Sequence, residues 1–226
     1  MAAPRTNPWV RFIWLGRCGR VRSTPSAGSS RAIATKCAWN RSRPPCKGCW
    51  VCSPKSDERR LFLALWPENR ERRQLAELAA TAAGRRRVPD ANLHLTLVFL
   101  GATPADRLTA YAAALADLSV PRLELLLDRY GHWSRSRILW LGSSHTPPEL
   151  YELVADLHRR LRGCGFAPER RTFQAHITLA RKFPGPAPAQ PPATPIRWPV
   201  EDVALVESLR DRTGSRYQVL RRWPGG

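Results

Sequence analysis

Apolar residues recur with strand and helix periods only from about residue 59 of this 226-residue chain. Residues 60–66 form an apolar run that predicts a short strand, after which Pro67 and Glu68 open a helix that Gly84 ends. The apolar stripe of this helix consists of Leu75, Leu78, Ala79 and Ala82. Residues 93–100 then predict a second strand. The first unit is therefore strand, helix, strand.

The same order returns later in the chain. Pro104 precedes a second helix, and residues 123–127 and 137–141 read as two strands that we expect to pair. A third helix begins near Pro148, and residues 173–180 follow it as another strand. The stripe of the third helix consists of Leu150, Leu153, Val154, Leu157 and Leu161. A strand–helix–strand unit over residues 137–180 thus repeats the one over residues 60–100.

The last part of the chain changes character. Residues 184–199 are rich in proline and read as an irregular surface loop. Residues 203–209 and 216–220 then predict two strands joined by a short turn, a hairpin. Together these elements predict an α+β fold with two similar lobes. Each lobe is expected to be an antiparallel sheet with helices on the outside, and a pseudo-two-fold axis relates the two across a central cleft.

Each repeated unit ends in a His-x-Thr-x strand: His94 with Thr96, and His176 with Thr178. Side chains alternate across a strand, so each histidine shares a face with its threonine. In the first motif Leu95, Leu97 and Phe99 are expected on the opposite, core face. A single His-x-Thr match is weak evidence, because a histidine on a half-buried sheet needs no function. Two matches in equivalent positions of a repeat favour a shared catalytic cleft.

Opening a cyclic phosphate requires a base that deprotonates water and an acid that protonates the leaving ribose oxygen. Histidine titrates near neutral pH and can serve as either. Threonine hydroxyls can donate hydrogen bonds to the phosphate oxygens. Two histidines make a poor catalytic zinc site without a third protein ligand, so no metal or other cofactor is expected.

Charge supports a polyanionic partner. The chain has 37 Lys and Arg against 18 Asp and Glu, a formal net charge of +19. No acidic residue precedes Asp57, and 11 of the basic residues lie in that segment. The remaining part is still basic, which favours a polyanionic partner such as nucleic acid or an anionic membrane surface. No apolar run reaches the length of a membrane span, so no membrane partner is expected.

Residues 1–56 show no sustained period and lack acids. We interpret them as a disordered extension or a wrongly assigned start, with a targeting peptide and a basic nucleic-acid arm as the alternatives. Cys46, Cys49 and Cys52 resemble half of a zinc site, but no second pair follows. Only Cys164 falls in the predicted domain, residues 57–226, which favours a reducing compartment, the cytoplasm.

Two segments, 92–97 and 175–181, resemble the paired motifs of the two-histidine phosphoesterase superfamily. Within it the chain most resembles the RNA 2′,3′-cyclic phosphodiesterases, historically also called 2′-5′ RNA ligases. Residues 60–65 and 138–142 support this closer match, which runs from about residue 59 to 223.

The resemblance implies hydrolysis of an RNA 2′,3′-cyclic phosphate end, or of a cyclic nucleotide, to a 2′-phosphomonoester. We expect the enzyme to be a monomer. It implies that His94 is the proton donor to the 3′ oxygen, that His176 is the base, and that Thr96 and Thr178 hold the phosphate. The residues alone leave the acid and base interchangeable. Two other functions stay open: 2′-5′ joining of RNA ends at the same site, and a non-catalytic RNA-binding module.

Several other side chains have both a functional and a structural interpretation. Arg181 can reach phosphate if it lies past the end of its strand; a surface ion pair is the alternative. His132 and Trp133 are expected in a loop, where a half-buried aromatic is favoured over a base-stacking one. Residues 85–87 are read as a solvated basic loop rather than an RNA guide. His145 and His158 are expected in solvent, and Cys164 is expected to be structural.

Overall fold

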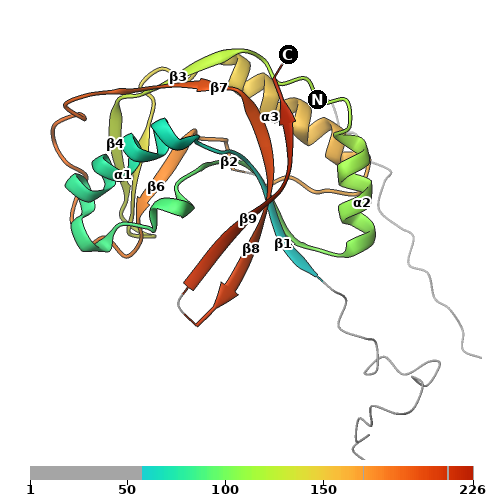
Figure 1. Ribbon diagram of the computed structural model, residues 1–226, viewed down its shortest axis with the longest axis horizontal. Helices are drawn as coiled ribbons and strands as arrows, with labels where there is room; N and C mark the ends of the chain where they lie inside the picture. Colours follow the sequence, from blue (N-terminus) through green and yellow to red (C-terminus); the bar gives the residue numbers. More distant parts are fainter. Residues whose placement is uncertain (1–57, 170, 213, 226) are drawn as a thin grey trace, which may run out of the picture. The chain divides into compact units, whose positions relative to one another are not determined.

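The computed structural model describes residues 58–169, 171–212 and 214–225 (Figure 1). In chain order the elements are β1 (Arg59–Leu65), α1 (Asn69–Ala83), η1 (Gly84–Arg86), η2 (Asp90–Asn92), β2 (Leu95–Thr103), α2 (Ala105–Ala114), β3 (Leu123–Leu127), β4 (Arg129–Trp133), β5 (Ile138–Gly142), α3 (Pro148–Arg162), β6 (His176–Ala180), β7 (Ile196–Val200), β8 (Asp202–Asp211) and β9 (Gly214–Pro224). The predictions for the segment 1–56, including its three clustered cysteines, lie outside the described residues.

The predicted α+β fold with two antiparallel lobes is confirmed. Seven strands hydrogen-bond in the order β4-β5-β6-β2-β1-β8-β9, and β3 pairs with β7 in a separate ribbon. The two lobes, β4-β5-β6 and β2-β1-β8-β9, meet where β2 pairs with β6, and that seam consists of the pair Leu95–Ile177. The units β1-α1-β2 and β5-α3-β6 are the repeat expected from the sequence.

Both helices of the repeat end as their sequences suggest. Gly84 adopts a left-handed φ of 54° and its N–H caps the carbonyl of Ala80, so α1 stops there. Pro148 opens α3, where its missing N–H is harmless, and three arginines in the last turn face the negative end of the helix dipole. All five residues of the predicted α3 stripe are buried.

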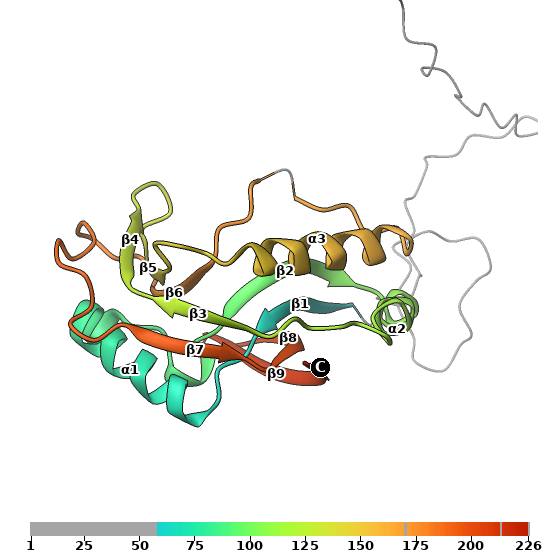
Figure 2. The same ribbon diagram turned by 90° about the horizontal axis from the view of Figure 1, so that it is seen from above.

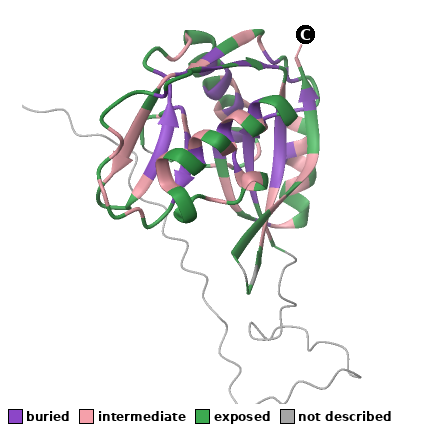
Figure 3. Cartoon of the chain, turned by 60° about the vertical axis from the view of Figure 1, so that its left-hand side comes forward, coloured by how far each residue is buried: buried purple, intermediate pink, exposed green. Residues whose placement is uncertain are grey.

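The helices cover the joint between the lobes. Helix α1 contacts β6 and β7, whereas α3 contacts β2 and α2. Each repeat helix therefore packs against the seam strand of the other lobe, and the core is continuous across the seam. Figure 3 shows the buried strands behind helices whose outer faces are exposed. This shared core fixes the position of the two lobes relative to each other.

Three predictions about the strands are wrong. β3 does not pair with residues 137–141; it pairs with β7, with Leu125 opposite Trp198 (Figure 2). β7 overlaps the end of the stretch predicted to be an irregular loop, and its residues Ile196, Trp198 and Val200 alternate as buried residues. His132 and Trp133 lie in β4, which pairs with β5, and not in a loop. These pairings join segments far apart in sequence, which local periodicity cannot reveal.

The expected face of Phe99 is also wrong. Leu95 and Leu97 are buried as predicted, but Phe99 is 42% exposed. The pairing of β2 with β1 shifts register twice, and Gly101 takes a φ of 75° beside the second shift. Each bulge reverses the alternation of side chains, so the simple parity of the motif fails after Leu97.

The hairpin of β8 and β9 is confirmed and is longer than predicted. It extends beyond the neighbouring strands in Figure 1. None of the helices in the described part of the chain combines the length and apolar character that crossing a bilayer requires.

Candidate active site

The seam between the lobes brings the two motifs together. Leu95 and Ile177, which form the paired position, each directly follow a histidine. In an antiparallel pair this register sets His94 opposite Thr178 and Thr96 opposite His176. His94 itself lies just before β2, and His176 is the first residue of β6. The four side chains therefore come from one short stretch of the seam, and each histidine faces the threonine of the other motif.

Both imidazoles are oriented by the same kind of hydrogen bond to the backbone. The Nδ1–H of His94 donates to the carbonyl of Asn92 at 2.7 Å, and that of His176 donates to the carbonyl of Gln174 at 2.9 Å. In each case the acceptor is two residues earlier. This bond fixes Nε2 as the atom that exchanges a proton with a substrate.

The two Nε2 atoms differ in their surroundings. The Thr96 hydroxyl lies 3.0 Å from Nε2 of His94 and donates to it when the ring is neutral. Nε2 of His176 has no hydrogen-bond partner among the described residues. Its lone pair is open to a water molecule in the cleft.

Burial dominates the electrostatics of both rings. It lowers the pKa of His94 to about 4, the Asn92 carbonyl opposes this, and the charges of Arg181 and His176 lower the pKa further. Burial also lowers the pKa of His176, with the Gln174 carbonyl opposing and Arg181 adding to the effect. Both rings are neutral at pH 7 in the empty site. Because the charge of Arg181 lowers the pKa of both histidines, its guanidinium lies close enough to interact with each ring.

Aromatic rings surround His94. The ring centroids of Phe62, Trp66 and Tyr217 lie 4.8, 5.6 and 5.1 Å from that of His94. The Arg72 guanidinium lies 5.3 Å from Trp66 and donates to the carbonyls of Pro67 at 2.7 Å and Asp90 at 3.1 Å. This arginine links α1 to the segment before His94.

His176 contacts the ring of Trp133, whose centroid lies 4.6 Å away in an edge-on arrangement. Trp133 also packs on Trp140 at 5.6 Å. Gly131 has no side chain, and a Cβ there would overlap the Trp140 ring. Sequence periodicity does not identify Phe62, Trp66 and Tyr217 as site residues, because they come from β1, the segment after it and β9. Trp133, which was expected in a loop, lies in β4.

The cleft around the seam consists of two cavities that share Phe99. The first, here called the His94 cavity, has a volume of about 540 Å³ and includes His94, Thr178 and Arg181. The second, the Trp133 cavity, has a volume of about 900 Å³ and includes His176, Thr96 and Trp133. The division follows the register of the seam, because each histidine lines a cavity with the opposite threonine.

Arg181 is the first residue after β6 and is exposed. It lies past the strand's end, as a phosphate contact requires, and lines the His94 cavity. No ion pair holds its guanidinium within the described part of the chain. Its side chain is therefore available to an anion in the cleft.

The remaining residues that the sequence singled out lie outside the centre of the cleft. Arg85 and Arg86 belong to the short helix η1 and are exposed, and Arg87 pairs with Asp90 at 3.2 Å. Cys164 is half-buried against the Ala110 carbonyl. His145 is exposed as expected. His158 is not: it packs on Phe166 and lines the Trp133 cavity.

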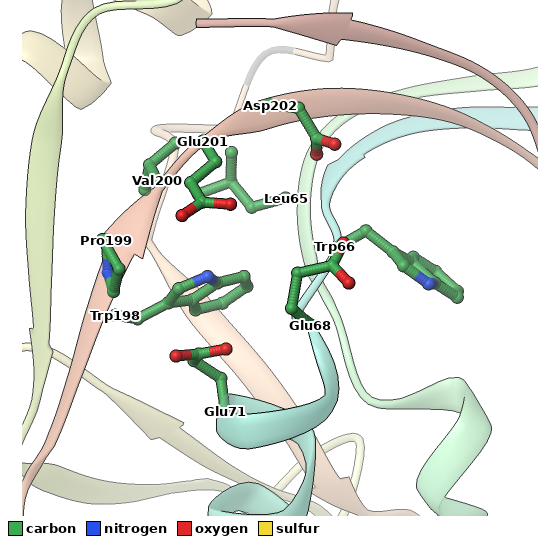
Figure 4. Close-up of a pocket in the computed structure, with 9 residues that line it drawn as sticks. All are labelled: Leu65, Trp66, Glu68, Glu71, Trp198, Pro199, Val200, Glu201 and Asp202. Carbon is green, nitrogen blue, oxygen red and sulfur yellow. The ribbon is translucent and has the colours of Figure 1, made fainter.

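A separate, small cavity of about 40 Å³ lies beside the start of α1 (Figure 4). Four carboxylates surround it, from Glu68, Glu71, Glu201 and Asp202, and the Trp198 indole lies among them. An acidic lining repels a phosphate, so this cavity does not suit the substrate that the histidines suggest. Within the described residues no cluster of three or more His, Cys, Asp or Glu side chains could hold a metal ion.

Comparison with known proteins shows the family of this chain. A sequence profile of the 2′-5′ RNA ligase superfamily matches residues 64–212. The RNA 2′,3′-cyclic phosphodiesterase of Escherichia coli (strain K12) is 34% identical over 172 residues, which cover 74% of this chain and 97% of that protein. The protein of the same name from Thermus thermophilus is 32% identical over 182 residues, 73% of this chain and 89% of its own.

Solved structures give the same result. The structure of E. coli LigT complexed with 3′-AMP superposes with a TM-score of 0.69 at 31% identity, covering 75% of this chain and 99% of that one. A second structure, described as a phosphoesterase, gives a TM-score of 0.70 at 32% identity, with coverage of 75% and 99%. The resemblance seen in the sequence is confirmed, and the chain belongs to the 2′-5′ RNA ligase superfamily.

Proposed function

We propose that this chain hydrolyses RNA 2′,3′-cyclic phosphate ends to 2′-phosphomonoesters by general acid/base catalysis that requires no metal. The observation that carries the proposal is the pair of imidazoles at the seam, each with Nδ1 bonded to backbone and Nε2 facing the cleft. The relatives named RNA 2′,3′-cyclic phosphodiesterase support the substrate class.

In the proposed mechanism the cyclic phosphate lies between the histidines. His176 Nε2 accepts a proton from water while the water oxygen bonds to phosphorus. The bond from phosphorus to the 3′ oxygen breaks, and His94 Nε2 donates a proton to that oxygen. Thr96 and Thr178 donate hydrogen bonds to the non-bridging oxygens, and Arg181 neutralises their charge. The open lone pair of His176 supports its role as the base.

The test is incubation with a 2′,3′-cyclic mononucleotide and with an RNA that ends in a cyclic phosphate. We expect a 2′-phosphate product, identified by ³¹P NMR against the 2′ and 3′ isomers, at a rate that EDTA does not change. Loss of activity in EDTA that added Mg²⁺ or Zn²⁺ restores would contradict the metal-independent scheme. A 5′-hydroxyl RNA in the same reaction reports end-joining: a joined product in excess of hydrolysis would instead favour a ligase.

The lowered pKa values predict an acidic optimum for kcat/KM. The active form needs His94 protonated and His176 neutral, and kcat/KM reports the free enzyme. Both pKa values lie below 6.5 in the free enzyme, so kcat/KM is expected to peak below pH 6.5 and fall as the pH rises. The two pKa values read from the acidic and alkaline limbs of this profile describe the pair of histidines, not either residue alone.

The bound substrate changes this dependence. An anionic phosphate beside His94 favours the imidazolium and raises its pKa. The alkaline limb of kcat should therefore lie at higher pH than that of kcat/KM. The measurement is a pH–rate series with a cyclic mononucleotide at low and at saturating concentration. If the alkaline limbs of kcat and kcat/KM coincide above pH 8, the lowered pKa values are contradicted.

A further inference from the structure

The two cleft cavities differ in charge as well as size. The His94 cavity contains Arg60, Arg181 and Arg210, and among the described side chains none that lines it is acidic. The Trp133 cavity contains Arg135 and Arg171 but also Glu169. A polyanionic strand is therefore attracted more strongly to the His94 side.

We infer that the RNA strand preceding the cyclic phosphate lies in the His94 cavity, along one face of the β8–β9 hairpin, where Arg60 and Arg210 bind its backbone phosphates. This inference rests on the proposed function and adds to it the course of the substrate beyond the reacting nucleotide.

The chemistry of the reaction gives the direction. Water attacks phosphorus on the side opposite the leaving 3′ oxygen, so the base and the acid lie on opposite sides of the phosphate. The acid, His94, is next to the 3′ oxygen, and the ribose that carries this oxygen must therefore lie on the His94 side. The preceding nucleotide is attached to the 5′ oxygen of the same ribose. The strand leaves the site from the His94 cavity.

The hairpin presents a polar face to that cavity. Ser208 lies opposite Tyr217, and Arg210 lies opposite Ser215. These four residues share one face of the hairpin and all line the His94 cavity. Arg216 lies opposite Leu209 and projects from the other face. Because the hairpin extends beyond the sheet (Figure 1), a strand longer than one nucleotide can follow it.

The hairpin is tied to the catalytic segment. The side-chain amide of Asn92 donates to the carbonyl of Ser215 at 2.7 Å, and Asn92 lies two residues before His94. The Tyr217 ring contacts His94 edge-on at 5.1 Å. RNA bound along this face of the hairpin is therefore held at a fixed position relative to His94, the proton donor.

Arg60 and Arg210 have no carboxylate partner among the described residues. Two other arginines of the same sheet do have one: Arg59 pairs with Glu207 at 3.5 Å, and Arg222 pairs with Asp202 at 2.6 Å. The Arg60 guanidinium lies over the Phe99 ring at 5.4 Å. Both guanidinium groups are therefore available to bind phosphates where the strand is inferred to lie.

The experiment compares kcat/KM for a hexanucleotide ending in a 2′,3′-cyclic phosphate with that for a 2′,3′-cyclic mononucleotide. We expect Arg210→Ala and Arg60→Ala each to lower the ratio of the two values by about tenfold, as expected for one lost charge-assisted hydrogen bond. Arg216→Ala removes the same charge from the opposite face of the hairpin and should leave the ratio unchanged. Arg135→Ala in the Trp133 cavity should also leave it unchanged.

Binding is measured separately, by fluorescence anisotropy of a labelled hexanucleotide ending in a 3′-phosphate. Arg210→Ala should weaken binding and reduce the salt dependence of log Kd by about 0.7, the value for one phosphate contact on a single strand. Equal weakening by Arg216→Ala would overturn the inference, as would a selective effect of Arg135→Ala. Because binding needs no turnover, a chain that fails to hydrolyse cyclic phosphates would overturn the proposed function without deciding the strand's course.

Discussion

Replacing His94 or His176 by alanine is expected to lower kcat/KM for a 2′,3′-cyclic nucleotide by about 10²–10⁴-fold, the range for removal of a positioned acid or base. Each ring has its Nδ1 held by a backbone carbonyl, so its Nε2 position is fixed before substrate binds. Within the described part of the chain, β2, β6 and the residue before β2 contain no further imidazole that could replace either one. The double variant should lose little more activity than the less active of the two single variants, because acid and base act on the same step.

The matched control is His145→Ala, which removes an exposed imidazole outside both cleft cavities and should keep full activity. Thermal melts of the three variants separate a chemical loss from misfolding, since the His94 ring packs among three aromatic rings. Substantial activity in either single variant at an unchanged melting temperature would refute the two-histidine mechanism.

The site could be predicted from the sequence to the extent that its signals are local. The stripe of α3 and the two His-x-Thr-x strands recur with regular periods, and the periods hold in the structure. The repeat also predicted that both motifs belong to one cleft. It could not predict that the pair Leu95–Ile177 alone joins the strands, and this pair decides which threonine faces which histidine.

What the sequence did not reveal depends on non-local pairing. The partner of β3 is β7, about 70 residues away, because an apolar strand can pair with any strand of suitable pattern. The rings around His94 come from β1, the segment after it and β9, whose proximity is a property of the sheet order. The exposed Phe99 follows from the register shift between Thr96 and Val98, which alternation alone cannot detect.

The second large effect is expected at the threonines. Thr96→Val and Thr178→Val each remove one hydroxyl donor while preserving shape, and each should lower kcat/KM by about 10²-fold, as for other lost donors to a charged transition state. Valine suits a strand, so the fold should tolerate the change. The two threonines lie on opposite sides of the cleft, in different cavities. Their losses should therefore combine in the double variant.

Serine separates the hydroxyl from the methyl group at each position. Thr96→Ser and Thr178→Ser keep the donor and should retain activity within about fivefold, a difference of roughly 1 kcal/mol. The measurement is kcat/KM for a cyclic mononucleotide, with melting temperatures as the check on folding. If serine is as damaging as valine, the methyl group packs against a neighbour and the hydroxyl is not the phosphate donor. If valine is harmless, Arg181 holds the phosphate without the threonines.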